Sequence, residues 1–140
     1  MMINWGILFI GLLLGANLLM AQDVKDGHGK MAMPDGSMYE GQFKDGLFDG
    51  QGRLDFPDNR HYVGEFKYGL YEGQGTFIYA DGSKYEGQFK EGQLNGLGVL
   101  TYADGGSFKG QFKDGEASGR GVLTDFSGAA HGGEFTGNSS

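Results

Sequence analysis

The side chains that could carry chemistry in this sequence recur at an interval of 23 residues. Four lysines share one position of the interval and could present a row of cations to the phosphates of a lipid surface. An acid directly follows three of them, so the local charge nearly cancels, and solvated charges that protect a strand edge from aggregation are the favoured interpretation. We call this set the lysine row: Lys44, Lys67, Lys90 and Lys113.

A second recurring set is acidic and could suggest calcium binding. Calcium-binding β-rolls need a GGxGxDx spacing that brings acids together between stacked turns, and a 23-residue period does not supply it. Three of these four aspartates precede a glycine, a pair that is instead typical of a turn. We therefore expect no metal at these residues: Asp35, Asp58, Asp81 and Asp104.

The sequence also offers no recognisable catalytic motif. The three histidines, His28, His61 and His131, form no HxxxH or HExxH spacing. The chain has no cysteine, which excludes a disulfide framework, a thiolate metal site and a cysteine nucleophile. We find no nucleophile-elbow motif and expect neither enzyme activity nor a cofactor.

The chain that positions these residues is itself periodic. Shifting the sequence by 23 residues superimposes five phenylalanines and three sets of five glycines without an insertion or deletion. The predicted units are 27–49, 50–72, 73–95, 96–118 and 119–137, between a short linker at 23–26 and a tail at 138–140. One position, the ring position, holds Tyr39, Tyr62, Tyr85, Phe108 and His131.

Each unit has the pattern of one β-hairpin. In the third unit, residues 75–79 and 85–89 alternate as half-buried strands do, and residues 80–83 form a turn. Residues 90–92 are expected to open a longer loop to the next unit. The prediction is an all-β protein, an elongated antiparallel meander of ten strands from about Gly29 to Phe135. Its glycines and aromatics share one face, where rings can lie flat on the backbone.

The other face of the predicted sheet carries branched side chains out of phase with the aromatics. A partly apolar exposed face can mark a surface for a protein partner. The alternative is that these residues are ordinary strand-forming residues. The candidate interaction surface consists of Val63, Ile78, Val99, Thr101, Val122 and Thr124.

The segments YEGQFKDG, YEGQFKEG, FKGQFKDG and YADGS resemble MORN (membrane occupation and recognition nexus) repeats. The usual form of that repeat is YEGxWxxGxxxGxGxxxxxDGxxY, and the resemblance covers residues 27 to about 137. It implies a non-catalytic scaffold or binding role, for which contact with lipid head groups has often been proposed. Departures fall mostly in the end units, as expected of a solenoid whose terminal repeats face solvent.

The first 22 residues differ from the rest because they carry no charged side chain. As a helix, residues 3–21 would extend roughly 28 Å at 1.5 Å per residue, close to the hydrocarbon thickness of a membrane. Ala21 before Gln22 also suits a signal-peptidase site. We expect residues 1–22 to be either a cleaved signal peptide or a retained membrane-anchor helix. Either places the repeats in an exported location, which is periplasmic, extracellular or luminal.

The charge balance narrows the class of partner. The net charge of −7 and the absence of a basic stripe argue against nucleic acid, which is bound through clustered lysine and arginine. The leading hypothesis is an exported or membrane-tethered scaffold that binds another protein. The alternative is peripheral recognition of lipid or polysaccharide at the cell envelope.

Overall fold

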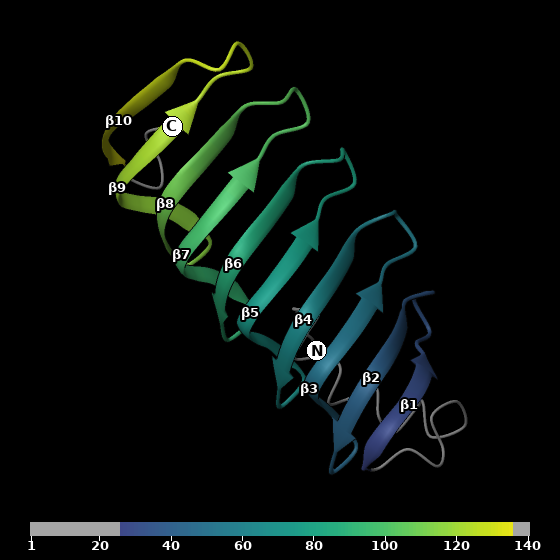
Figure 1. Cartoon of the computed structure of the whole chain (residues 1–140). Helices are drawn as coiled ribbons and strands as arrows, with labels where there is room; N and C mark the ends of the chain where they lie inside the picture. The colour runs from purple at the N-terminus through teal and green to yellow at the C-terminus, as the bar shows by residue number, and fades with distance from the viewer. Residues whose placement is uncertain (1–25, 136–140) are drawn as a thin grey trace.

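The computed structural model describes residues 26–135, which form one ten-stranded antiparallel sheet in chain order (Figure 1). The hairpins lie side by side in an elongated, twisted sheet with β1 and β10 at opposite ends. The predicted all-β meander of tandem hairpins is therefore confirmed. The strands are β1 (Gly27–Ala32), β2 (Met38–Lys44), β3 (Leu47–Asp55), β4 (His61–Lys67), β5 (Leu70–Ile78), β6 (Lys84–Lys90), β7 (Gln93–Thr101), β8 (Ser107–Lys113), β9 (Glu116–Thr124) and β10 (Ala130–Phe135).

The apolar N-terminal segment belongs to a part of the chain that the structure does not describe. The helix predicted for residues 3–21, and with it the signal or anchor assignment of residues 1–22, lies outside residues 26–135. Within the described residues no helix is long and apolar enough to span a membrane.

The turn predicted at residues 80–83 is present and recurs in every hairpin. The Gly82 N–H donates to the Tyr79 carbonyl at 2.9 Å, and the Ser83 N–H donates to Asp81 Oδ1 at 2.8 Å. Gly82 has φ +94°, a conformation that costs glycine little. The recurring aspartates therefore hold turns together, as the sequence predicts.

The second connection is shorter than predicted. β6 ends at Lys90 and β7 begins at Gln93, so only Glu91 and Gly92 join them. Both residues have positive φ, 49° and 88°, as in the two-residue type I′ turns that match the twist of a hairpin. The expected longer loop at residues 90–92 is thus wrong, because residues 93–95 already belong to the next strand.

A bulge follows each of these tight turns. Between the pairs Gly41–Gly52 and Phe43–Phe48, three residues of β3 lie opposite Gln42 alone. The Gln42 Oε1 accepts the Gln51 N–H at 2.9 Å, which satisfies an amide that the bulge removes from the regular ladder. The same bond joins Glu65 to Gln74 and Gln88 to Leu97. Such bulges bend a strand and increase its twist.

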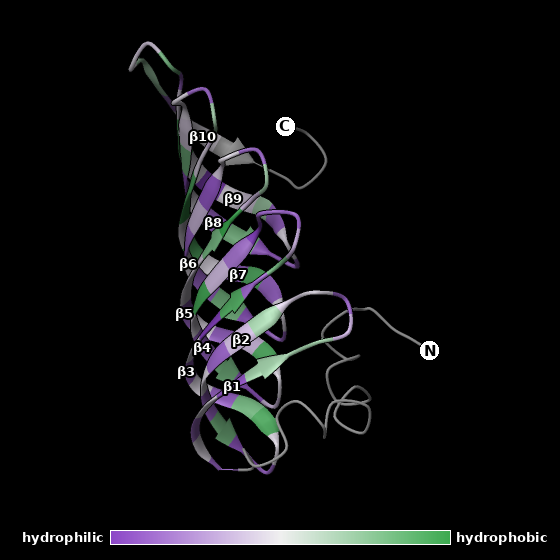
Figure 2. Cartoon of the chain, turned by 90° about the vertical axis from the view of Figure 1, so that its right-hand side faces the viewer, coloured by the Kyte–Doolittle hydropathy of each residue, from purple (hydrophilic) through white to green (hydrophobic). Residues whose placement is uncertain are grey.

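One face of the sheet, the ring face, holds the core. The fully buried Tyr62 ring stacks on Tyr71 with centroids 4.0 Å apart and contacts Phe66 and Phe89 edge to face. A Cβ built on Gly75 would lie 2.6 Å from Tyr62 Cζ, so the ring lies directly on that glycine. This confirms the predicted packing of rings on bare backbone. Figure 2 views the sheet from the side and shows hydrophobic and hydrophilic residues alternating along the strands.

Candidate functional site: the outer face of the sheet

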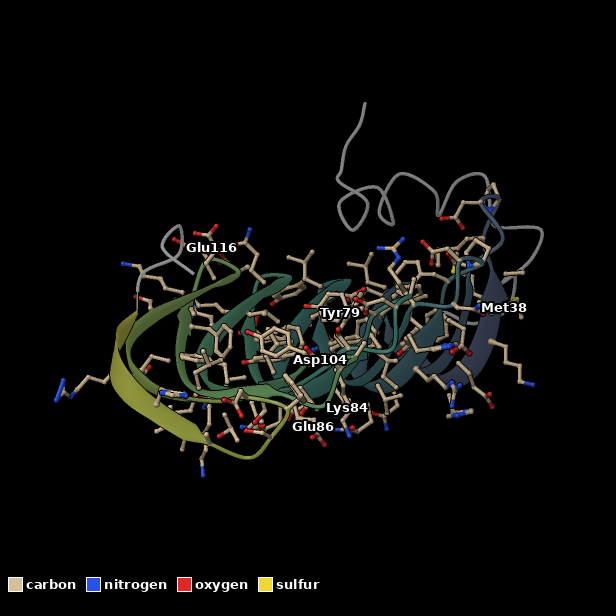
Figure 3. The ribbon with its side chains drawn as sticks, turned by 90° about the horizontal axis from the view of Figure 1, so that it is seen from above. Met38, Tyr79, Lys84, Glu86, Asp104 and Glu116 are labelled. Atoms are coloured by element: carbon tan, nitrogen blue, oxygen red, sulfur yellow. The ribbon has the colours of Figure 1, made fainter. Side chains whose placement is uncertain are left out.

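The face opposite the rings, which we call the outer face, carries all six residues of the candidate interaction surface. In Figure 3, Lys84 and Glu86 project to this side of the strands, away from Tyr79. Strand register places the six residues in two neighbouring rows that run across the strands. One row contains Val63, Val99 and Val122, and the other contains Ile78, Thr101 and Thr124.

These six residues do not form one patch. Glu86 stands between Val63 and Val99 in the first row, and Lys84 separates Ile78 from Thr101 in the second. Lys84 Nζ and Glu86 Oε1 are 3.6 Å apart and form an exposed ion pair across the middle of the face. The structure therefore groups the residues of β7 to β9 and leaves those of β4 and β5 apart.

A shallow groove of about 810 Å³ lies over β7 to β10 on the outer face. Val99 and Val122 line it, as does Leu97, whose exposed fraction is 60%. Among the residues whose side chains the structure describes, Lys109 and Arg120 supply the charged part of the lining. The backbone of glycines lines the rest: Gly98, Gly110, Gly121, Gly132 and Gly133.

Sequence reasoning missed three residues of this groove, namely Leu97, Lys109 and Arg120. A signal for two of them was present as a departure from the repeat. Leu97 and Arg120 occupy the position that holds glutamine at Gln51 and Gln74 in the second and third units. A leucine and an arginine at a position that holds glutamine in the second and third units would have directed attention to the C-terminal units.

The groove combines apolar side chains with two cations in a protein whose net charge is −7. A second hollow of about 450 Å³, over β3 to β6, is more polar and includes Glu86 in its lining. Basic and apolar side chains on a fixed strand lattice suit a partner segment that carries acidic and aliphatic side chains. None of the described residues that line the groove over β7 to β10 is a nucleophile beside a base.

The lysine row lies at one end of the strands. Each of its four members is the last residue of an even-numbered strand and precedes a two-residue turn. Lys67 differs from the others because Tyr68, not an acid, follows it. The Lys67 Nζ lies 5.6 Å from the centroid of the Tyr68 ring, and Tyr68 is 70% exposed with φ +53°.

Two histidines each lie beside an aspartate. His61 Nδ1 lies 2.6 Å from Asp55 Oδ1, which also accepts a hydrogen bond from Arg53 Nε at 2.9 Å. His131 Nε2 lies 3.6 Å from Asp125 Oδ2 on the last hairpin. Among residues 26–135 no three His, Asp or Glu side chains gather closely enough to hold a metal ion.

Comparison with known proteins agrees with the repeat pattern. The model of the MORN repeat family matches five segments of the chain: 20–38, 39–59, 62–84, 85–107 and 108–130. The last four of them begin at Tyr39, Tyr62, Tyr85 and Phe108, the residues of the ring position. No curated protein matches the chain. Because the five segments cover most of the sequence, the chain belongs to the MORN repeat family.

Proposed function

We propose that this chain is a non-catalytic interaction module whose outer-face groove binds an acidic, aliphatic segment of another protein. The groove over β7 to β10 is the observation that carries the proposal. It combines exposed aliphatic side chains, two cations and a volume of about 810 Å³. Membership of the MORN repeat family supports a role in protein interaction or membrane association.

The physical case rests on preorganisation. Leu97 and Val122 are held on paired strands, so binding need not order the backbone beneath them. Complete burial of an exposed aliphatic side chain contributes roughly 1.5–3 kcal/mol, and these two are already partly covered. Lys109 and Arg120 add attraction for carboxylates, which raises the association rate and selects against basic partners.

Selection from a random-peptide display library tests the proposal. Immobilised wild-type protein should enrich peptides that contain aspartate or glutamate beside leucine, isoleucine or valine, and their binding should weaken with salt. Leu97→Gln, which restores the residue found in other units, should lose that enrichment. Val63→Thr alters the same face outside the groove and serves as the matched control. Enrichment that is equal on wild-type and Leu97→Gln protein would show that the groove is not the binding surface.

The location of the module is a separate part of the proposal. Residues 1–22, which lack any charge, would export the repeats as a cleaved signal peptide or tether them as a membrane anchor. The mass of the protein recovered from cells distinguishes the two, since cleavage leaves an N-terminus at Gln22. Recovery of the intact chain in the cytosolic fraction would contradict both.

Recognition of lipid or polysaccharide at the cell envelope is the second candidate, and the Lys67–Tyr68 pair favours it. An exposed aromatic beside a lysine that no acid directly follows is suited to a membrane interface. Flotation with vesicles of phosphatidylcholine, with and without phosphatidylserine, tests the lipid version at two salt concentrations. Failure to float with the phosphatidylserine vesicles at both salt concentrations would exclude the lipid version. Flotation that Tyr68→Ala abolishes would support it.

A further inference from the structure

Each ring in the middle of the array covers two glycines on neighbouring strands. Tyr85 on β6 covers Gly87 of its own strand, where an added Cβ would lie 2.7 Å from the hydroxyl, and Gly98 of β7. Phe108 on β8 covers two glycines in the same way. A Cβ added to Gly110 would lie 2.9 Å from Phe108 Cζ, and a Cβ added to Gly121 of β9 would lie 2.5 Å from Phe108 Cε1. An even-numbered strand therefore completes its packing only when the next odd-numbered strand is beside it.

In the part of the chain that the structure describes, β10 has a residue at the ring position but no following strand whose glycine that residue could cover. His131 occupies the ring position, yet its side chain is 63% exposed, whereas Tyr85 is fully buried. A Cβ added to Gly133 would meet no atom within 4 Å. Among the described residues, β10 pairs only with β9, so its outer edge has unpaired N–H and C=O groups.

β1, at the other end of the sheet, has the glycines of an odd-numbered strand but no preceding described strand to supply a ring. Gly27 has φ +92° and is followed by Gly29, just as Gly96 with φ +97° is followed by Gly98 in β7. β1 thus begins like the strands that follow an even-numbered strand, although within residues 26–135 it pairs only with β2. The two ends lie far apart in one molecule (Figure 1), so one copy cannot join them.

We infer that the β10 edge of one copy pairs with the β1 edge of a second copy and extends the sheet head to tail. The β8–β9 pairs Lys109–Val122 and Gly110–Gly121 set the register. Moved by whole repeats, this register places Gly132 opposite Lys30 of the second copy and Gly133 opposite its Gly29. His131 would then cover the second copy's Gly29 as Phe108 covers Gly121.

Such a contact joins two different surfaces and does not close on itself, so chains of several copies can grow. One strand pair buries far less than the roughly 1,600 Å² of a standard stable interface. Association is therefore expected to be weak and to depend on protein concentration. This inference does not rest on the outer-face groove, and either can fail without the other.

Disulfide trapping tests the register directly, because the chain contains no cysteine. Residues directly opposite each other on paired strands have Cβ atoms about 4.5–5.5 Å apart, close enough for a disulfide after a small adjustment. Full-length protein with both Lys30→Cys and Gly132→Cys should give a ladder of dimers and larger species on non-reducing gels after mild oxidation. Each single variant should run as a monomer on the same gels. Cross-linking by Gly132→Cys alone would indicate β10–β10 pairing and overturn the inference.

Gly133→Ala provides a second test that leaves the fold intact. The added methyl group meets nothing in one copy. In the pair it would meet the Gly29 backbone of the second copy, as a Cβ on Gly110 would lie 2.7 Å from Gly121 Cα. Sedimentation of the full chain in a mild detergent should show concentration-dependent association that Gly133→Ala weakens about tenfold or more. A monomer at every concentration, or association unchanged by Gly133→Ala, would refute head-to-tail pairing.

Discussion

Replacing Gly75 with alanine should destabilise the protein through one specific collision. The new Cβ would lie 2.6 Å from Tyr62 Cζ, whereas carbon atoms in favourable contact are about 3.5–4.0 Å apart. The ring would have to move by roughly 1 Å to restore that separation. Tyr62 is fully buried, stacked 4.0 Å from Tyr71, and its hydroxyl donates to the Glu65 carbonyl at 2.7 Å. No part of this ring can move without disturbing one of these contacts.

The expected cost follows from the contacts that the ring would strain. Overpacking a well-packed core typically costs about 1–3 kcal/mol, and weakening the Tyr62 hydroxyl bond adds about 0.5–1.5 kcal/mol. Loss of the conformational freedom of glycine in the unfolded chain returns about 0.4–1 kcal/mol. The net loss for Gly75→Ala is therefore about 2–3 kcal/mol. At about 4 °C per kcal/mol, the Tm should fall by roughly 10 °C.

Thermal and urea unfolding followed by circular dichroism measure this loss. Gly133→Ala is the matched control, because Gly133 occupies the equivalent row of the last strand and its added Cβ would meet nothing within 4 Å. Its stability in dilute solution should change by less than about 0.5 kcal/mol. Equal stability of Gly75→Ala and wild-type protein, or equal losses in the two variants, would refute the argument that rings lie on the glycines.

Three further changes probe the turns, the bulges and the buried phenols. Tyr68→Asn should stabilise the protein by about 0.5–1 kcal/mol, because asparagine tolerates the φ of +53° that strains tyrosine; urea unfolding that shows no gain would contradict this. Gln88→Ala should cost about 0.5–1 kcal/mol by removing the 2.8 Å bond to the Leu97 N–H, whereas Gln74→Ala on the same face should cost less in the same assay. Burial raises the pKa of Tyr85 to about 12, above the value of about 10 expected in the unfolded chain. Stability is then fully present below about pH 10 and is lost as the pH rises towards 12; ionisation of all seven tyrosines near pH 10 with intact circular dichroism would contradict this.

Much of the architecture follows from local pattern. The 23-residue period, the hairpin in each unit and the ring face are readable because strand residues alternate and glycines recur with the rings. Even the covering of Gly75 by Tyr62 is implied by a ring and a glycine at fixed positions of every unit. These features depend on neighbours within one repeat or the next, and the sequence contains the repeat five times.

Local pattern alone was less reliable where the chain changes direction. Glu91 and Gly92 form a complete turn, although the sequence suggested a longer loop. The reason is that the bulge inserts residues into the strand, and inserted residues look like a loop when pairing is unknown. The hydrogen bond from Leu97 to Gln88, which identifies the bulge, joins residues nine positions apart on different strands.

The sequence by itself determined the family, the meander and the side of the sheet on which each residue lies. Only the tertiary structure decided which outer-face residues act together. Register places Lys84 and Glu86 between the two parts of the predicted surface and brings Leu97, Lys109 and Arg120 together in one groove. Neighbours across a sheet come from different strands, and bulges and turns set their alignment. A residue's face can therefore be read from alternation along the chain, whereas its neighbours depend on pairing between strands.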